Sequence, residues 1–479
     1  MKLIRNYLYN AGYQILVIIV PLLTSYYVSR TLLPTGVGIN AFTNSIIQYF
    51  ILFANMGIGY YGNMKIAHVR DDRYKLSISF WEIQIVKMLM TAISCIAFII
   101  FMYFYTRNSV YMWAQSLNLI AVIFDISWFY QGIEDFKKVV LRGILVKILS
   151  MIAIFTFIKG PHDLVLYIIL LALSTLLGNL TLWPKLQNVL ISVKINKLKP
   201  MQHFWPMVAM FVPQIATQVY VQLNRTMVGV MISERASGYY QYSDNLIKLV
   251  LAIVTATGTV MLPHMANMIS KSSITEVNRL LYKSFNIVSA LSFPLAFGLA
   301  SVSFSLAPLY YGHGYEPVGL AMFSESIVIL FIGWSNVMGI QYLLPIGETK
   351  KFTVSITMGA IVNIVLNIPL IYYGGLNGAM ISTVLSELAV TLYQFWSVRN
   401  KLKIGSLFKG VWKYAVASTI MFASVFKMNM YFEKTWLLLF IEVMCGAVIY
   451  MLIIIILKAD IISYGVEILK KGNIFERNK

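Results

Sequence analysis

The feature that most constrains this chain is its series of long apolar runs. Runs of about 20 apolar residues, separated by short polar or charged segments, recur along almost the whole sequence. A helix of that length crosses the hydrocarbon core of a membrane, which is about 30 Å thick. Of the 479 residues, 59% are hydrophobic and only 12% are charged, a mixture that cannot supply both a core and a water-exposed surface. The sequence therefore predicts an all-α integral membrane protein.

The apolar runs predict about 14 transmembrane helices with short connections. The first run is interpreted as a span and not as a signal peptide, because it is too long for an ordinary signal and no small-x-small cleavage site follows it. The predicted spans are 8–29, 40–62, 79–105, 112–131, 139–157, 164–183, 204–231, 239–265, 284–309, 319–344, 352–373, 375–398, 411–428 and 435–457.

The basic residues predict how the chain is oriented. The net charge is +19, from 38 Lys and Arg against 19 Asp and Glu. With the N-terminus in the cytoplasm, about 28 of the basic residues lie inside, about 6 outside and about 4 within spans, as the positive-inside rule requires. No stretch combines basic residues with exposed stacking aromatics, so nucleic acid is not an expected partner. We expect an even number of spans, with both termini cytoplasmic.

A repeat divides the chain. Residues 38–47 (GINAFTNSII) align with residues 238–247 (GYYQYSDNLI), near the starts of the second and eighth predicted spans. Both repeats begin on the same side of the membrane, which predicts two parallel six-helix lobes. The expected domains are an N-terminal lobe (1–184), a basic cytoplasmic linker (185–203), a C-terminal lobe (204–398), and two further helices with a cytoplasmic tail (399–479).

Polar stripes mark three of the predicted helices. In the fourth span, Gln115, Asn118 and Asp125 lie on one stripe. In the seventh span, Arg225 shares one helix face with Gln214, Gln218 and Gln222. Either this stripe lines a hydrated cavity, where the guanidinium offers several donors to an anion, or Arg225 extends outward near the end of a tilted helix.

The second span carries the matching stripe. Asn40, Asn44 and Gln48 follow one another at a spacing of four residues, and Arg30 lies at the expected outer mouth. We expect the two stripes to belong to one substrate cavity, because the second and seventh spans are among the helices that the repeat relates.

Several charged residues interrupt the apolar runs, where they are costly. Asp244 and Lys248 are four residues apart and can pair. Either they form a structural ion pair, or they are functional, with Lys248 in the substrate cavity and Asp244 as a candidate ion-coupling residue. Asp125 is a candidate ion-coupling residue, and a packing hydrogen bond is the alternative. Glu387 is a further coupling candidate, although neighbouring hydroxyl groups can satisfy it.

Four other charges are expected to have structural roles. Glu82 is expected either to pair with another helix or to extend to the cytoplasmic surface, and the second is favoured because it lies near the end of its span. Lys147 and Glu442 are expected at the interface or in helix packing, and Lys87 is expected to pair with another helix or to extend to the same surface.

The sequence contains no motif for enzymatic chemistry. It has no GxxxxGK[ST] loop, no HExxH and no GxSxG, its five histidines lack metal-ligand spacing, and its two cysteines lie apart within apolar runs. We expect no catalytic residues, no metal, no cofactor and no ATP hydrolysis.

Six stretches resemble one family. They are YLYNAGYQIL (7–16), residues 53–70 with GIGYYGNMKIA, DISWFYQGIEDF (125–136), NRTMVG (224–229), GETK (347–350) and NIVLNIPLIYYGGLNGA (363–379). With these segments the chain resembles the Wzx-type polysaccharide flippases of the multidrug/oligosaccharidyl-lipid/polysaccharide (MOP) exporter superfamily. Asn224 departs from the family pattern, which commonly has Asp before the basic residue.

The resemblance implies a function. It implies transport of an undecaprenyl-diphosphate-linked oligosaccharide repeat unit from the inner to the outer leaflet of the bacterial cytoplasmic membrane, by alternating access of the two lobes. Arg225 and Arg30 would then contact the diphosphate. The implied partners are the lipid-linked oligosaccharide, membrane lipid, and a polysaccharide polymerase with its assembly proteins.

Two other functions remain open at this point. A cation-coupled drug antiporter of the same superfamily shares the lobes but normally has twelve helices and little need for cationic cavity residues. A membrane polysaccharide polymerase is expected to have a large extracellular loop, whereas the outside loops here are about ten residues or fewer. A membrane scaffold without transport activity would not need the repeated polar stripes.

Overall fold

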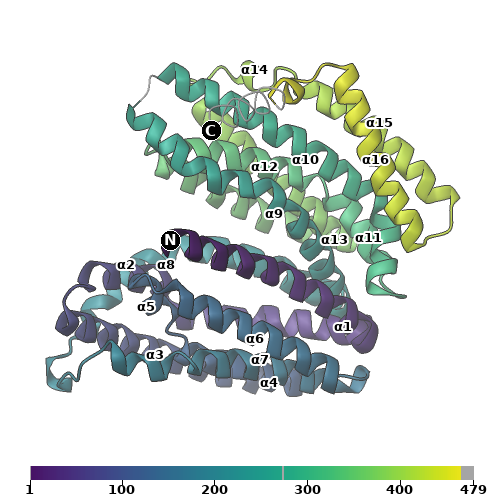
Figure 1. Ribbon diagram of the computed structural model, residues 1–479. Coiled ribbons are helices and arrows are strands. Elements are labelled where there is room, and N and C mark those ends of the chain that lie inside the picture. The colour runs from purple at the N-terminus through teal and green to yellow at the C-terminus, as the bar shows by residue number, and fades with distance from the viewer. Residues whose placement is uncertain (1, 272–273, 465–479) are drawn as a thin grey trace. The chain divides into compact units, whose positions relative to one another are not determined.

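The structure is a computed structural model that describes residues 2–271 and 274–464, and in these residues all regular structure is helical (Figure 1). This confirms the predicted all-α fold. The first part of the chain contains α1 (Lys2–Asn55), α2 (Ile58–Val69), α3 (Arg73–Phe104), α4 (Ser109–Phe124), α5 (Ser127–Gly132), α6 (Phe136–Phe157), α7 (Leu164–Leu180) and α8 (Phe204–Met231), with short 3₁₀ turns η1 (Pro161–Asp163), η2 (Trp183–Asn188), η3 (Ile195–Lys197) and η4 (Pro200–His203).

The second part begins with a long polar-faced helix. It contains α9 (Glu234–Lys271), α10 (Ile274–Tyr311), α11 (Glu316–Glu325), α12 (Val328–Ser335), the π-helical segment η5 (Asn336–Leu343), α13 (Thr349–Val398), α14 (Ile404–Leu407), α15 (Val411–Tyr431) and α16 (Trp436–Ile456).

Two of these elements are each a pair of helices joined at a sharp break. α1 breaks at Leu33, whose φ of 59° and ψ of 170° are not helical, directly before Pro34. A proline ring disfavours helical geometry in the residue before it, so the break is encoded locally. α13 breaks at Gly375, whose φ of 56° and ψ of −136° suit a residue without a Cβ. The break at Leu33 falls between two predicted spans, and Gly375 is the first residue of the predicted span 375–398.

Eight helical stretches within the described residues are long and apolar enough to cross a membrane, and the bent pair formed by α11 with α12 and η5 makes a ninth. Two of the eight, Ile19–Val69 and Thr349–Val398, contain the breaks just described. These spans establish a multi-pass membrane protein. The count of 14 helices and the cytoplasmic position of both termini stay predictions.

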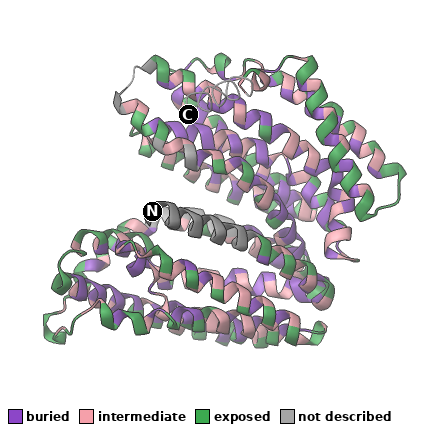
Figure 2. Cartoon of the chain, viewed as in Figure 1, coloured by how far each residue is buried: buried purple, intermediate pink, exposed green. Residues whose placement is uncertain are grey.

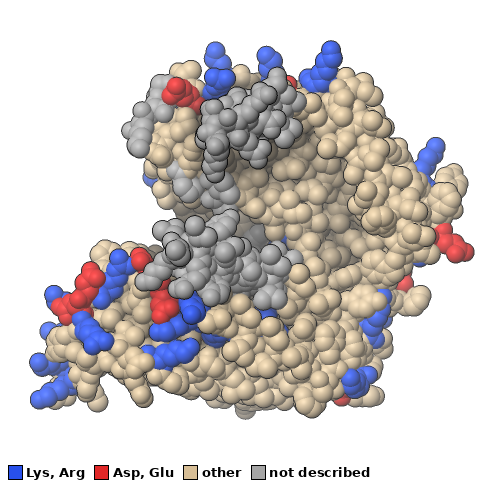
Figure 3. Space-filling view, in the orientation of Figure 1, with Lys and Arg blue, Asp and Glu red and all other residues tan. Residues whose placement is uncertain are grey.

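The surface is apolar where a soluble protein would be polar. Large aliphatic side chains such as Ile96 (58% exposed), Leu149 (54%) and Val443 (54%) lie on the outside of the helices, and buried residues fill the middle of each unit (Figure 2). On the face drawn in Figure 3, Lys and Arg gather towards the ends of the helices and leave a surface with few charged side chains between them. This distribution matches a hydrocarbon belt bounded by polar headgroups.

The chain forms two compact units, Met1–Gly238 and Tyr239–Lys479. In the first unit, α1 packs against α3, α4, α6 and α8, and α4 packs against α7. In the second unit, α10 packs against α11 and α15, and α15 packs against α16. α8 therefore packs with the first unit. The expected lobes divide the chain by its sequence repeat and not by its contacts, so their boundaries stay a prediction.

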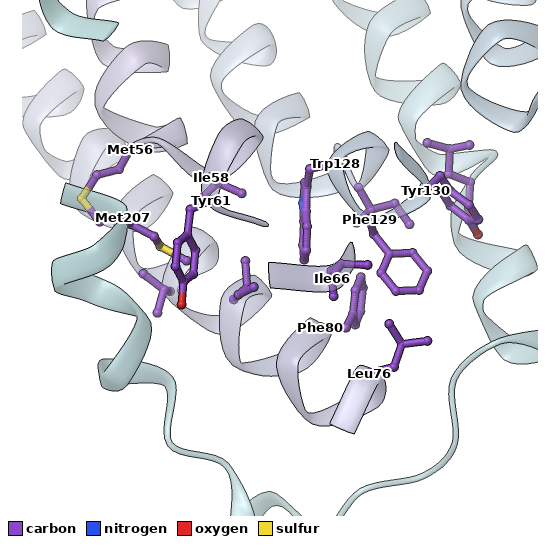
Figure 4. Packing of buried hydrophobic residues seen from close by; sticks show 14 of the residues in the cluster. Met56, Ile58, Tyr61, Ile66, Leu76, Phe80, Trp128, Phe129, Tyr130 and Met207 are labelled. Carbon is purple, nitrogen blue, oxygen red and sulfur yellow. The ribbon is translucent and has the colours of Figure 1, made fainter. Parts of the chain in front are cut away.

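An aromatic cluster fixes one end of the first unit (Figure 4). Phe80 of α3 stacks on Trp128 of α5, with ring centroids 5.7 Å apart, and makes an edge contact with Phe129 at 5.0 Å. Ile66 of α2 and Met207 of α8 belong to the same buried cluster. Four helices are thereby held together at this end of the unit.

Candidate functional site

A polar cluster lies between the second half of α1 and α4. Its centre is Gln115, whose side chain is 1% exposed. Its Nε2 donates to Asn40 Oδ1 at 3.1 Å, and its Oε1 accepts from Asn118 Nδ2 at 2.9 Å and from Asn44 Nδ2 at 3.4 Å. The structure thus joins Asn44 of the predicted site to a stripe on α4. The three asparagines are only half-buried, so amide groups remain at the surface of the cluster.

α8 completes this polar face. Thr226 Oγ1 is 2.9 Å from Ser45 Oγ and 3.1 Å from the Tyr49 hydroxyl, so hydrogen bonds link α8 to the second half of α1. Gln222 and Arg225 lie on the same turn of α8 as Thr226, and both are half-buried. We call the surface formed by Asn40, Asn44, Gln115, Asn118, Gln222, Arg225 and Thr226 the polar face. Its side chains offer amides and a cation within helices that are otherwise apolar.

The other predicted cavity residues are not part of the polar face. Gln218 is exposed and Gln48 is half-buried. Arg30 is exposed, and its guanidinium stacks 3.8 Å above the Tyr26 ring and donates to the Tyr26 carbonyl at 3.3 Å. The side chain of Gln214 lies outside the described residues.

At the end of the polar face, α1 and the start of α9 meet backbone to backbone. A Cβ on Gly38 would lie 2.5 Å from the Glu234 carbonyl oxygen and 2.6 Å from the Arg235 Cα. A Cβ on Gly238 would lie 2.8 Å from the Gly38 Cα. Glycine is therefore required at both positions. These two residues occupy equivalent places in the sequence repeat, and the structure puts them in direct contact.

A charged cluster closes the same junction. Glu234, at the start of α9, pairs with Arg107 Nε at 2.7 Å and accepts from Asn108 Nδ2 at 2.6 Å. Ser237 Oγ donates to the carbonyl of Arg225 at 3.0 Å. The connection between α3 and α4, the end of α8 and the start of α9 are thus held together next to Gly238.

In the second unit, the start of α9 makes a parallel set of contacts. Asp244 is buried and pairs with Lys248 Nζ at 2.7 Å, while half of the Lys248 side chain stays exposed. Ser243 Oγ donates to Glu325 Oε2 at 3.1 Å, and the Tyr240 hydroxyl is 3.2 Å from Thr383 Oγ1. The predicted Asp244 and Lys248 pair is present. Polar side chains of α9 therefore contact α11 and α13.

Glu387 follows Thr383 by one turn of α13. Its side chain is half-buried, and its carbonyl accepts from Thr391 Oγ1 at 2.8 Å. Because Tyr240 bonds to Thr383, the contact between α9 and α13 is one helical turn away from both Asp244 and Glu387.

Asp125 lies at an interruption of the helix between α4 and α5. Its Oδ1 accepts from the Ser127 backbone N–H at 3.0 Å and pairs with Arg142 at 3.3 Å. Arg142 also donates to Asn179 Oδ1 at 2.7 Å. Asp125 therefore bonds to the first residue of α5 and to α6, and Arg142 in turn links α6 to α7.

Side-chain donors satisfy the carbonyl groups that this interruption frees. Lys87 Nζ donates to the Asp125 carbonyl at 2.5 Å, and Trp183 Nε1 donates to the Phe124 carbonyl at 2.9 Å. Gln84 and Asn179 bond the carbonyls of Ile123 and Ala121 at 2.7 and 2.8 Å. An interrupted backbone in a membrane needs such partners, because hydrocarbon supplies none.

The prediction that Glu82 extends to the surface is wrong. Its side chain is 2% exposed, and its carboxylate accepts from the Lys199 backbone N–H at 2.6 Å and from Gln202 Nε2 at 2.8 Å. His203 Nε2 lies 2.8 Å from the same carboxylate. Burial among these donors replaces hydration, so Glu82 binds the end of the linker and does not extend to water.

His203 connects Glu82 to α2. Its Nδ1 is 2.6 Å from the Tyr61 hydroxyl. Burial lowers the pKa of His203 below its usual value, although the neighbouring Glu82 opposes this shift. A neutral ring that donates from Nε2 to Glu82 and accepts at Nδ1 from Tyr61 satisfies all three groups. The arrangement joins α2, α3 and the residues that lead into α8.

Replacing Glu82 with alanine is expected to loosen the linker. The change leaves the Lys199 N–H, Gln202 and His203 without their acceptor, at a cost of about 1–3 kcal/mol for each buried donor left unpaired. Trypsin should then cleave faster at the linker lysines, as followed by gel electrophoresis of the purified protein. Glu134→Ala removes a carboxylate from the exposed Arg70 pair and should leave cleavage unchanged. Equal cleavage of the two variants would contradict the assigned role.

Several residues of these clusters were not singled out from the sequence. Arg142 lies near one end of its predicted span, where basic residues are common, and His203 has no metal-ligand spacing. Glu234 and Thr226 carry no pattern of their own. Among the described residues, no group of three or more His, Cys, Asp or Glu side chains is placed to hold a metal ion.

The sequence also matches known proteins. Residues 3–269, more than half of the chain, match the family described as "Polysaccharide biosynthesis protein". A relative in Escherichia coli (strain K12), named "Putative O-antigen transporter", is 24% identical over 418 residues, which are 84% of this chain and 97% of the relative.

Solved transporter structures share the fold. The lipid II flippase MurJ in its inward closed conformation matches with a TM-score of 0.74 at 16% identity, covering 94% of this chain and 100% of that one. An inward-facing multidrug resistance MATE family transporter of the MOP superfamily matches with a TM-score of 0.61 at 13% identity, covering 81% and 95% of the two chains. These comparisons confirm the resemblance drawn from the sequence, and the relatives they name are transporters, not enzymes. The chain belongs to the polysaccharide biosynthesis protein family, as a multi-pass bacterial membrane protein with the fold of MOP superfamily transporters.

Proposed function

We propose that the protein is a flippase that moves an undecaprenyl-diphosphate-linked oligosaccharide repeat unit from the inner to the outer leaflet for surface polysaccharide assembly. Family membership and the name of the E. coli relative support a role in polysaccharide transport. The observation that carries the proposal is the polar face of α1, α4 and α8. Amide side chains and Arg225 on membrane helices have a clear use if a sugar headgroup must cross the membrane beside them.

The polar face suits the parts of such a substrate. Sugar hydroxyls both donate and accept hydrogen bonds, as the amides of Asn44 and Gln222 do. A diphosphate requires cations, and the planar guanidinium of Arg225 can bind two of its oxygens at once. Arg30 and Lys248, both exposed, are proposed as further cationic contacts. The prenyl tail would remain in the hydrocarbon.

Alternating access is proposed to depend on the junction of Gly38 and Gly238. An axis that relates two repeats passes midway between equivalent residues, so only residues at the axis contact their own counterparts. The contact of Gly38 with Gly238 supports such an axis at this junction. We propose that the junction is a gate, which closes one side of the substrate path when the two backbones touch and opens when they part.

The membrane potential can give the movement its direction. An inside-negative potential favours outward movement of an anion by about 2.3 kcal/mol per charge per 100 mV. Any charge on the diphosphate that Arg225 and its neighbours leave unneutralised would be driven outward.

Ion coupling is a second proposed contribution. Asp244 and Glu387 each lie one turn from the bonded contact of α9 with α13, so protonation or cation binding there would act on the packing of these helices. Asp125 is the third candidate, although its bonds to Ser127 and Arg142 already give it a structural role. Transport measured with and without a proton or sodium gradient, in the wild type and in Asp244→Asn, distinguishes coupling from voltage-driven flow.

Arg225→Ala is expected to abolish the function, and Arg225→Lys to retain part of it. Alanine removes both the charge and the donors, whereas lysine keeps the charge without the planar fork. Restoration of surface polysaccharide in a deletion strain, at matched protein levels, measures the effect. Val230→Ala, on an exposed apolar side chain of the same helix, serves as the control. Full activity of Arg225→Ala would exclude Arg225 as the diphosphate contact.

A drug antiporter is the second candidate, because the MATE fold match is consistent with it. The deletion strain separates the two functions. Loss of surface polysaccharide with accumulation of lipid-linked repeat units supports the flippase. Increased drug sensitivity with normal polysaccharide would support the antiporter. We also propose a polysaccharide polymerase and its assembly proteins as partners, because they would consume the product at the outer leaflet.

A further inference from the structure

A basic pocket of about 870 Å³ lies in the second unit, and none of the residues proposed for transport lines it. Four separate segments line it: Met268 near the end of α9, the first turns of α10, the loop that follows α13, and Tyr464. Its cations are Arg279, Lys283, Lys401 and Lys403, against one lining carboxylate, Glu276. The volume lies within the range of about 300–1,000 Å³ that is usual for ligand clefts. The excess of positive charge in the pocket favours an anionic ligand.

Contacts hold the segments of this basic pocket in place. The Lys403 backbone N–H donates to the Tyr282 hydroxyl at 3.2 Å, which fastens the loop to α10. Lys401 Nζ bonds Glu348 at 2.6 Å, and this ammonium lowers the pKa of Glu348 below its usual value. The Lys283 ammonium lies 4.5 Å from the centre of the Tyr464 ring. These contacts fix the loop against α10 and restrict the ammonium groups of Lys401 and Lys283 before any ligand binds, which reduces the entropy lost on binding.

The depth of the basic pocket in the membrane indicates the kind of anion. The apolar stretch of α10 starts at Thr275, and residues of its first turns line the pocket. The pocket therefore lies at one end of this membrane span, next to the polar boundary of the membrane. Tyr282 and Tyr464 line the pocket at this level, where tyrosine is enriched in membrane proteins. Lipid phosphates lie at the same depth, and basic pockets between helices bind anionic headgroups.

We propose that the basic pocket binds the phosphate headgroup of an anionic phospholipid, with Arg279, Lys283 and Lys403 as the principal contacts. Lys401 contributes less to binding, because its ammonium is already paired with Glu348. Such a lipid would bridge α10 and the loop after α13. The proposal concerns a lipid that stays bound at the membrane boundary, and it does not depend on the transported substrate.

Binding of a fluorescent phosphatidylglycerol to the full-length protein in detergent tests the proposal. We expect saturable binding that weakens with rising salt, and much weaker binding of the phosphatidylcholine probe, which has no net charge. Arg279→Gln/Lys283→Gln/Lys403→Gln should weaken phosphatidylglycerol binding at least about tenfold. Lys185→Gln/Lys194→Gln/Lys197→Gln removes the same charge from exposed positions of the first unit and should have little effect.

Three outcomes would overturn the proposal. One is an equal loss of affinity in the two triple variants, which would mean that total charge decides binding. Another is unchanged binding to the pocket variant, provided that its melting temperature and elution volume match the wild type. The third is displacement of the lipid by millimolar inorganic diphosphate, because this would identify a free anion, and not a lipid headgroup, as the ligand. Single Arg279→Gln, on an exposed side chain, keeps the test open if the triple variant does not fold.

Discussion

Transport is expected to fall at least about tenfold in Gly38→Ala and in Gly238→Ala. Each new Cβ would meet backbone atoms within 3 Å, and backbone cannot move aside as a side chain can. Forcing extra atoms into a close-packed contact costs about 1–3 kcal/mol, and 1.4 kcal/mol corresponds to tenfold in an equilibrium. The penalty falls on the state in which α1 and the start of α9 touch, so the closed gate loses population. Complementation of surface polysaccharide in the deletion strain measures the effect.

A labelling experiment separates gate opening from misfolding. Val37 is buried beside Gly238, so a cysteine placed there by Val37→Cys, with Cys95 and Cys445 replaced by serine, should react slowly with an impermeant maleimide. Adding Gly238→Ala should speed the reaction at normal protein levels. Gly59→Ala is the matched control, because a Cβ there meets no atom within 4 Å. Unchanged labelling and full transport in both gate variants would refute the gate.

The second large effect is expected at the interruption between α4 and α5. Lys87→Met leaves the Asp125 carbonyl without its charged donor. Leaving a buried acceptor without its partner costs about 1–3 kcal/mol, and more where the lost bond came from a charged group. Lys87 is 1% exposed, so water cannot replace it. We expect a lower melting temperature in detergent and a reduced protein level in the membrane.

Asp125→Asn separates a structural from an ion-coupling role. The amide oxygen can still accept from the Ser127 N–H. The bond to the first residue of α5 is therefore retained, while the titratable group is lost. We expect the variant to be more stable than Lys87→Met. If the variant transports and responds to an applied ion gradient as the wild type does, Asp125 is structural. A stable variant without transport would instead support coupling at Asp125. Lys147→Met, which removes a half-buried lysine of α6, is the control for loss of charge within a span.

The helices could be predicted because their signals are local. Residues 204–231 were predicted as one span and form α8 with these bounds, because the apolar run ends in polar residues on both sides. The break at Leu33 follows from Pro34, and the break at Gly375 follows from the conformational freedom of glycine. Such features depend on a few neighbouring residues, which a single sequence displays in full.

The partners of the polar residues could be predicted only in part. Asn44 and Gln115 lay on recognisable stripes, but only packing brings α1 against α4 so that they bond. Glu82 was misplaced because its partners Lys199 and His203 lie more than a hundred residues away along the chain. Gly38 and Gly238 were aligned as repeat equivalents, yet nothing in the alignment reveals that they touch. Contacts between distant segments depend on the packed structure, which periodicity does not encode.

Reconstituted transport tests the central claim most directly. The purified protein is placed in liposomes that contain a fluorescent undecaprenyl-diphosphate oligosaccharide, and an impermeant reductant destroys the fluorescence of probe molecules that reach the outer leaflet. We predict that the wild type exposes inner-leaflet probe to the reductant, that Arg225→Ala does not, and that Val230→Ala, on an exposed apolar side chain of α8, behaves as the wild type. Loss of fluorescence no greater than in protein-free liposomes, or an equal loss with Arg225→Ala, would contradict a flippase that binds the diphosphate through Arg225.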